Sequence, residues 1–333
     1  MTRSKIGSIL LVVLALVALA ACGDDDTTQV AESGDRPETT ESPGSDPGDT
    51  DAGDDGVFPV TVSADNGEIT IEARPERIVS LSGTATEMLF AIDAGDQVEA
   101  VDSHSTHPPE APLTDLAAFD ANTEAIAELD PDLVVLSYDP GGVVDGLDLL
   151  GIPSILFDAA ADMDEVYTQI EVLGAATGNV GAAAELVSQM QTDLDRIIAE
   201  LPDHAEGLTY FHELDDMYYT ATSTTFIGQI YGLLGLVNVA DTADADGTSG
   251  GYPQLSEEYI IEADPDLIFL ADAACCGQDA DSVAARPGWA GITAVTNGAV
   301  FVIDDDVASR WGPRIIDFIA DVADSVAALE PAG

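Results

Sequence analysis

The chain has 333 residues, 63 of them acidic and only 9 basic, which gives a formal net charge of −54 at pH 7. From residue 57 onward, 51 acidic residues stand against six arginines and no lysine. This balance argues strongly against nucleic-acid binding, because phosphate binding needs clustered lysine and arginine. A high negative charge also keeps a protein soluble at high salt, so a saline habitat is a hypothesis that concerns solubility and not the fold.

Residues 1–22 have the pattern of an export signal. Arg3 and Lys5 precede an apolar run from Ile9 to Ala21, and Cys22 follows the small residues at its end. The run is shorter than the roughly 20 apolar residues of a membrane-spanning helix, although an uncleaved anchor helix is the alternative. The segment resembles bacterial lipoprotein signal peptides. That resemblance implies lipidation of Cys22 and a lipid-anchored protein on the outer face of the cell membrane.

Residues 23–56 are predicted to form a disordered acidic linker. The segment holds twelve acidic residues, one arginine and no apolar periodicity. Such a composition cannot bury enough apolar surface to fold, and its like charges extend it.

A repeated segment organises the rest of the chain. Residues 124–136 and 258–270 share the pattern of a short amphipathic helix, an Asp-Pro-Asp turn and a continuous apolar run. An apolar run of this kind is typical of a strand that is buried on both faces of a parallel sheet. The two copies therefore predict two similar lobes.

Further short apolar runs alternate with helical patterns around each copy, as in three-layer α/β domains. The runs span residues 78–81, 98–101, 154–157, 208–211 and 300–303. Residues 163–201 read as helix with a break near Gly178. We expect two Rossmann-like α/β lobes, at 57–160 and 203–333, joined by a single long helix within 161–202.

Four segments add a family resemblance to this organisation: 77–91, 103–111, 252–258 and 310–314. In order and spacing they resemble the substrate-binding lipoproteins of ABC importers in the helical-backbone (class III) group for iron-siderophores, haem and cobalamin. The resemblance implies a non-enzymatic monomer that captures a metal chelate in a cleft between the lobes and delivers it to a permease and its ATPase. It implies no cofactor beyond iron or cobalt carried by the ligand, and leaves open which chelate is bound.

The same resemblance suggests ligand contacts. Tyr138 and Tyr252 match positions where aromatic residues flank the ligand in cobalamin-binding relatives, and half-buried core tyrosines are the alternative. A histidine in the 103–111 loop can coordinate iron or cobalt, or simply be solvated. An arginine can pair with ligand carboxylates or catecholates. The full set of candidate ligand residues is Ser82, Thr84, His104, Tyr138, Glu213, Tyr252, Arg310 and Trp311.

Two glutamates and two cysteines complete the candidates. Glu87 and Glu258 match the positions at which one exposed glutamate per lobe docks on permease arginines, unless each is an ordinary solvated acid. Cys275 and Cys276 are adjacent, and in an oxidising compartment they form a vicinal disulfide or remain two thiols.

Other functions have weaker support in the sequence. The motifs of serine hydrolases, P-loop nucleotide-binding proteins and zincin metalloproteases are not found in this chain. A zinc or manganese importer component remains the alternative, although four histidines are few for a bare-ion site. A metal-dependent surface hydrolase using His104, His107 and His212 is less favoured still.

Overall fold

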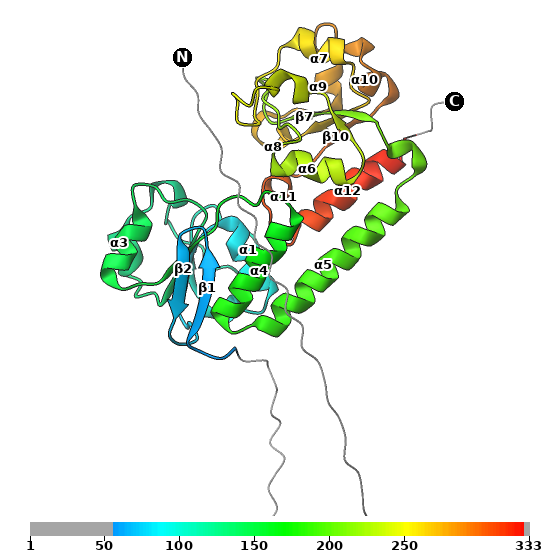
Figure 1. Ribbon diagram of the computed structural model, residues 1–333. Coiled ribbons are helices and arrows are strands. Elements are labelled where there is room, and N and C mark those ends of the chain that lie inside the picture. The colour runs from blue at the N-terminus through cyan, green and yellow to red at the C-terminus, as the bar shows by residue number, and fades with distance from the viewer. Residues whose placement is uncertain (1–55, 330–333) are drawn as a thin grey trace, which may run out of the picture. The chain divides into compact units, whose positions relative to one another are not determined.

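The structure, a computed structural model, describes residues 56–329 (Figure 1). The expected signal segment, Cys22 and residues 23–55 of the expected linker lie outside the described residues. Within the described part, no helix is long and apolar enough to cross a membrane.

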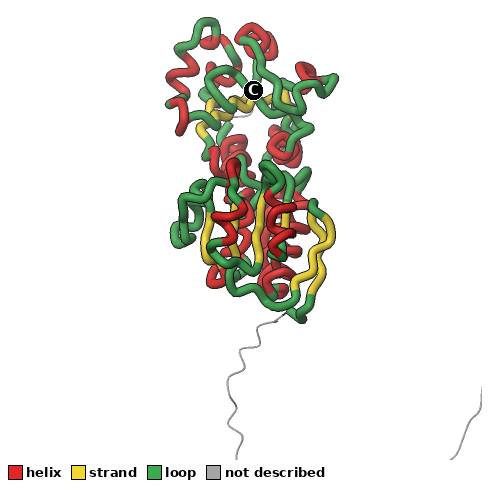
Figure 2. The backbone as a smooth tube through the Cα atoms, turned by 90° about the vertical axis from the view of Figure 1, so that its left-hand side faces the viewer, coloured by secondary structure: helices red, strands yellow, loops and turns green. Residues whose placement is uncertain are grey.

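The first lobe is built on a parallel sheet with strand order β4-β3-β5-β6. Its strands are β3 (Ile78–Leu81), β4 (Val98–Val101), β5 (Leu133–Leu136) and β6 (Ser154–Leu156). Its helices are α1 (Gly83–Ala91), α2 (Thr123–Ala127) and α3 (Val143–Leu150), and the antiparallel pair β1 (Val60–Ala64) and β2 (Gly67–Ile71) precedes them. Figure 2 shows helices on both sides of a sheet.

Both faces of this first sheet are buried. Leu133 and Val135 of β5 belong to an apolar cluster with residues of α1, whereas Val134 and Leu136 belong to a second cluster with residues of α2 and α3. Successive side chains of a strand point to opposite faces, so a strand covered on both faces needs a continuous apolar run. This explains the uninterrupted apolar composition of residues 133–136.

The second lobe has a parallel sheet with strand order β10-β9-β7-β8. Its strands are β7 (Thr209–Glu213), β8 (Val237–Asn238), β9 (Leu267–Leu270) and β10 (Val300–Val302). Its helices are α6 (Phe226–Leu233), α7 (Glu257–Ala263), α8 (Ala273–Cys276), α9 (Ala280–Ala284), α10 (Thr293–Asn297) and α11 (Asp305–Ala308). The prediction of two parallel-sheet α/β lobes is confirmed.

The repeated segment forms the same unit twice, as α2–β5 and α7–β9. An aspartate with left-handed backbone follows each helix: Asp264, at φ 47°, is the C-cap of α7, and Asp130, at φ 51°, lies just beyond the C-cap of α2. Aspartate tolerates this region, and the following proline cannot continue a helix. The second aspartate of each turn then binds the segment that starts a neighbouring strand: Asp132 accepts from the amides of residues 76 and 77, and Asp266 accepts from the amide of Thr209 at 2.9 Å.

Residues 161–202 contain two helices, α4 (Met163–Thr177) and α5 (Val180–Glu200), which are separated at the break expected near Gly178. Gly178 ends α4 at φ 78°. Residues of α4 pack in the first lobe's core, and α5 is the long linking helix.

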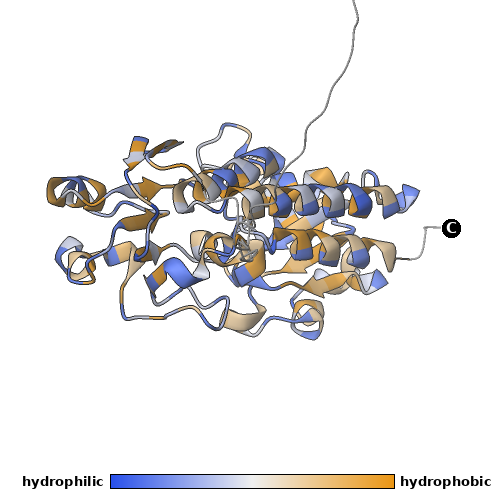
Figure 3. Cartoon of the chain, turned by 90° about the horizontal axis from the view of Figure 1, so that it is seen from below, coloured by the Kyte–Doolittle hydropathy of each residue, from blue (hydrophilic) through white to orange (hydrophobic). Residues whose placement is uncertain are grey.

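The linking helix α5 is amphipathic, with Ala183, Val187, Met190 and Ile197 buried. This spacing places an apolar stripe on one side of the helix, and Figure 3 shows hydrophilic and hydrophobic residues alternating along the long helices. The last helix, α12 (Ile315–Ala327), packs beside α5 (Figure 1).

Candidate functional site

The carboxyl ends of parallel strands meet at one edge of each sheet, which is where ligands of α/β domains bind. Ser82 follows β3 at this edge of the first lobe. Its hydroxyl oxygen accepts from the amide of Ala85 at 3.1 Å and lies 2.5 Å from the Ser137 hydroxyl oxygen. Ser82 and Thr84 are both buried. Ser82 is therefore the N-cap residue of α1.

Three exposed rings lie together at the same edge. His104 follows β4, Phe119 lies in the connection to α2, and Tyr138 follows β5. The ring centroids are 6.0 Å apart for His104 and Phe119 and 5.7 Å apart for Phe119 and Tyr138. Phe119 is 70% exposed and Tyr138 52% exposed. We call these three residues the aromatic cluster.

Phe119 was missed in the sequence analysis. It stands outside every motif, and the 15 residues between Ser103 and Phe119 give no periodicity that would bring it near His104. The available signal was a large aromatic residue in a polar connection, where an exposed ring of this size needs an explanation.

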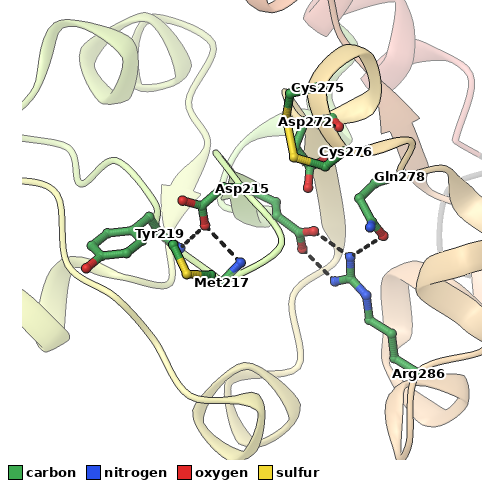
Figure 4. Close-up of a disulfide and its surroundings, with 9 residues drawn as sticks. Asp215, Met217, Tyr219, Asp272, Cys275, Cys276, Gln278 and Arg286 are labelled. Carbon is green, nitrogen blue, oxygen red and sulfur yellow. Dashed lines mark hydrogen bonds and ion pairs between the residues drawn. A yellow bond between two sulfur atoms is a disulfide. The ribbon is translucent and has the colours of Figure 1, made fainter.

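The carboxyl edge of the second sheet holds a buried ion pair (Figure 4). Glu213 ends β7 and has no exposed surface. Arg286 donates to both of its carboxylate oxygens, at 2.6 and 2.5 Å, and to Gln278 Oε1 at 2.8 Å. The guanidinium carbon also lies 4.6 Å from the centroid of the Trp289 ring. Glu213 is thus held in a bidentate structural pair and is not a free rim carboxylate.

Asp272 lies close to this pair, two residues beyond β9. Its side chain is fully buried, and neither carboxylate oxygen has a hydrogen-bond partner among the described residues. Burial raises the pKa of Asp272 to about 7, and the negative charge of Glu213 adds to the increase. A carboxyl group in such surroundings holds a proton near neutral pH.

Cys275 and Cys276 in α8 are joined by a disulfide, the first of the two states left open by the sequence. Both cysteines are exposed, and the Cys276 amide donates to the Asp272 carbonyl oxygen at 2.9 Å. Figure 4 shows Met217 and Tyr219 in the surroundings of this disulfide. Tyr252 is 45% exposed.

Arg310 and Trp311, two further candidate ligand residues, are engaged with protein groups. Arg310 donates to Glu87 Oε1 at 3.1 Å, to the His104 carbonyl oxygen at 3.0 Å and to Asp306 Oδ1 at 3.0 Å. The indole nitrogen of Trp311 donates to Gln169 Oε1 at 3.0 Å. These contacts join the segment after α11 to the first lobe.

The expectation that Glu87 is exposed was wrong. Its side chain is 2% exposed and lies between Arg310 and Arg314, and the Arg314 guanidinium donates to it at 2.9 and 2.6 Å. A carboxylate so buried is stabilised by its two arginines and has no surface to offer a partner.

His212 and His107, two further histidines considered in the sequence, lie in different surroundings. His212, one of the three histidines considered for a metal-dependent hydrolase, is fully buried, and its Nδ1 lies 2.9 Å from the Tyr231 hydroxyl oxygen. Burial lowers its pKa to about 4. His107 lines a cavity of about 270 Å³ together with Glu87 and Arg314. Among the described residues, no three His, Cys, Asp or Glu side chains are grouped to hold a metal ion.

The profile of the periplasmic binding protein family matches residues 78–307. The chain belongs to this family. Members of the periplasmic binding protein family bind solutes and are not enzymes, and the predicted resemblance to ABC-importer substrate-binding proteins is confirmed at the level of the family.

Several similar proteins are named for transport or for the ligand that they bind. An uncharacterized ABC transporter substrate-binding lipoprotein, YvrC of Bacillus subtilis, is 32% identical over 280 residues, covering 81% of this chain and 86% of that protein. A cobalamin-binding protein of Halobacterium salinarum is 33% identical over 282 residues, covering 80% of this chain and 74% of that protein. The solved structure of the periplasmic vitamin B12 binding protein BtuF of Vibrio cholerae matches with a TM-score of 0.59 and 27% identity, covering 76% of this chain and 96% of that chain.

In the internal repeat, the residue equivalent to Glu258 on the first lobe is Glu124, not Glu87. Glu258 is exposed in the first turn of α7, whose N-cap is Ser256. The equivalent residue of the other copy is Glu124, exposed in the first turn of α2, whose N-cap is Asn122. The two glutamates therefore occupy the same position of the same unit, one on each lobe.

Proposed function

We propose that this protein is the lipid-anchored, extracytoplasmic substrate-binding component of an ABC importer, and that its ligand is a corrinoid of the cobalamin type. The observation that carries the ligand assignment is the exposed aromatic cluster of His104, Phe119 and Tyr138 at the carboxyl edge of the first sheet. The names of the cobalamin-binding and vitamin B12-binding relatives support it. The protein supplies no cofactor of its own, and the chelate brings its metal.

The chemistry of the aromatic cluster suits a large flat chelate. Aromatic rings offer wide apolar surface at low conformational cost, and offset or edge contacts with another ring system add to the burial. The chain's net charge of −54 disfavours an anionic ligand such as a ferric catecholate siderophore, because a field of one sign repels that sign. A corrin ring with amide side chains meets no such repulsion.

A second candidate ligand, haem, is favoured by one observation. The His104 side chain is 67% exposed within the aromatic cluster, and an exposed imidazole can become an axial ligand of haem iron. Haem carries carboxylates, so the negative charge of the chain opposes it more than it opposes a corrinoid.

The partners of the proposed function are a permease and its ATPase. We assign the docking contacts to Glu124 and Glu258, which are exposed and equivalent in the repeat. Exposed charges of this kind set the rate and register of association. Lipidation of Cys22 would tether the protein to the outer face of the membrane, and the acidic linker would hold the folded part away from an anionic surface.

Thermal denaturation of the full chain with cyanocobalamin, haem, ferric siderophores or zinc ions tests this proposal. A ligand at about 100 times its dissociation constant adds roughly 2.7 kcal/mol of stability, which is a clear shift in Tm. Cyanocobalamin is expected to give this shift. A shift with zinc alone would contradict the proposal and favour a metal-ion importer component.

The aromatic cluster is tested by single substitutions. Phe119→Ala and Tyr138→Ala are each expected to weaken cyanocobalamin binding about tenfold, from the loss of stacking and buried apolar area. Leu149→Ala is the matched control, because Leu149 is 89% exposed on α3. Equal losses in all three variants would refute the assigned site.

A further inference from the structure

Three charged residues from distant parts of the chain form one buried cluster, which we call the latch: Glu87, Arg310 and Arg314. Glu87 lies in α1, and the two arginines lie 223 and 227 residues later in the chain. The side chains are 2%, 13% and 22% exposed, respectively. The latch therefore joins the segment before α12 to the first lobe by charge-assisted hydrogen bonds that water reaches little.

Gly83 and Gly312 lie against the latch, where a residue with a Cβ atom would crowd its side chains. A Cβ atom on Gly83 would lie 3.2 Å from the guanidinium carbon of Arg310. One on Gly312 would lie 3.3 Å from Glu87 Oε2. Both distances are tighter than ordinary van der Waals contact, so larger residues at either position would push on the ion pairs.

The two arginines differ in what else they hold. Among the hydrogen bonds of the described residues, Arg314 donates only to Glu87. Arg310 donates to Glu87 and also to the main-chain carbonyl oxygen of His104, at 3.0 Å. His104 belongs to the aromatic cluster, with its ring 6.0 Å from that of Phe119. Arg310 is therefore a direct connection between the latch and the proposed ligand site.

His104 has further contacts within the first lobe. Its amide donates to the buried carboxylate of Asp102 at 3.3 Å, and its Nδ1 lies 3.5 Å from the same group. The ring is exposed, its Nδ1 also lies 3.3 Å from the Ser103 hydroxyl oxygen, and its edge meets Phe119. The main chain of residue 104 is thus held at its amide by Asp102, and at its carbonyl oxygen by Arg310 and by the Thr106 amide, which donates at 2.9 Å.

We propose that Arg310 is a positioning residue of the ligand site: anchored on Glu87, it holds the His104 carbonyl and thereby sets the place of the His104 ring for the ligand. This inference rests on the proposed function, because it assumes that the aromatic cluster binds the ligand. Under this proposal Arg310 does not contact the ligand directly, because its terminal nitrogens donate to three protein acceptors.

Arg310→Gln and its control Arg314→Gln separate the two roles, because each removes one arginine from Glu87 and leaves the other. Arg310→Gln is expected to weaken cyanocobalamin binding by the full chain about tenfold, the effect of losing one charge-assisted hydrogen bond. Arg314→Gln is expected to change it less than about threefold. Equal losses in the two variants would overturn the proposal, since they would mean that any break in the latch has the same effect.

A double-mutant cycle with His104→Ala tests the route through His104. If Arg310 acts through His104, Arg310→Gln in the His104→Ala background changes affinity by less than about twofold. A loss in that background as large as in the wild type would mean direct ligand contact or general destabilisation, and either result would refute positioning. Arg310→Lys serves if Arg310→Gln fails to fold, because lysine keeps a cation for Glu87 but lacks the second arm that reaches His104.

A measurement without ligand separates this proposal from the proposed function. The chain has four histidines, so the ring signals of His104 in an NMR spectrum can be assigned by their loss in His104→Ala. Arg310→Gln is expected to shift these signals, and Arg314→Gln to leave them in place. Failure of the wild type to bind cyanocobalamin or haem would refute the proposed function, whereas unshifted His104 signals in Arg310→Gln would refute the positioning role.

Discussion

Arg286 donates two hydrogen bonds to Glu213, at 2.6 and 2.5 Å, and the Glu213 side chain has no exposed surface. Removing one partner of such a pair leaves a buried charge without compensation. Arg286→Met is therefore expected to lower the free energy of unfolding by about 3–5 kcal/mol, measured by urea denaturation.

Arg196→Met is the matched control for this substitution. Arg196 pairs with Asp193 and Glu200 on α5, but its side chain is 54% exposed. Exposed pairs contribute about 0–1 kcal/mol, so the control is expected to lose no more than that. Similar losses in the two variants would show that the Glu213 pair carries no special stability.

The protonation of Asp272 predicts a pH dependence of stability. Its pKa is raised from the ordinary 3.8 to about 7, so between these values the folded state binds a proton that the unfolded state has released. The stabilisation is complete below pH 4 and is lost as pH rises to about 7, with a slope of at most about 1.4 kcal/mol per pH unit.

Asp272→Asn is expected to flatten this part of the stability profile, measured by urea denaturation from pH 4 to 8. Asp145→Asn is the control, because Asp145 is exposed on α3. If the wild-type slope over this range survives in Asp272→Asn, another group holds the proton.

Two glycines of α6 predict opposite effects of the same substitution. A Cβ atom on Gly228 would lie 2.0 Å from the Thr222 carbonyl oxygen, whereas one on Gly232 would meet no atom within 4 Å. Gly232→Ala is expected to raise the free energy of unfolding by up to about 1 kcal/mol through helix propensity. Gly228→Ala is expected to lower it by several times that amount, because a main-chain atom must move. Thermal denaturation that ranks the two variants in the other order would contradict this reading of the packing.

The fold was predictable because its signals are local and repeated. The apolar runs and Asp-Pro-Asp turns of residues 124–136 and 258–270 report burial on both faces of a sheet, and they specify the same unit in each lobe. The break at Gly178 was visible as well, but the sequence did not reveal that α4 packs with the first lobe, since that depends on contacts between distant residues.

The candidate site was less predictable for the same reason. Glu87 looks like any solvated acid in a chain with so many, and only the fold brings Arg310 and Arg314 to it across more than 220 residues. Phe119, in the short 3-10 helix Ala118–Asp120 of a long connection, lies beside His104 and Tyr138. Ionic and aromatic partners of high sequence separation leave no periodicity, so a sequence pattern identifies the edge of the sheet but not the groups that meet there.

Charge reversal of the two equivalent glutamates tests the docking assignment. Glu124→Arg combined with Glu258→Arg is expected to abolish ligand uptake by cells, because the exposed charges that meet the permease change sign. Binding of cyanocobalamin by the purified double variant is expected to stay unchanged, since neither residue belongs to the aromatic cluster.

The repeat itself offers the matched control for this experiment. Glu128 and Glu262 are also exposed, are also related by the repeat, and lie four residues further along the same two units. Glu128→Arg with Glu262→Arg makes the same change in net charge, so uptake that survives it but fails in the first pair depends on position and not on total charge. Loss of uptake in both pairs would instead point to the overall field of the chain. Normal uptake with Glu124 and Glu258 reversed would remove these two residues from the permease contact.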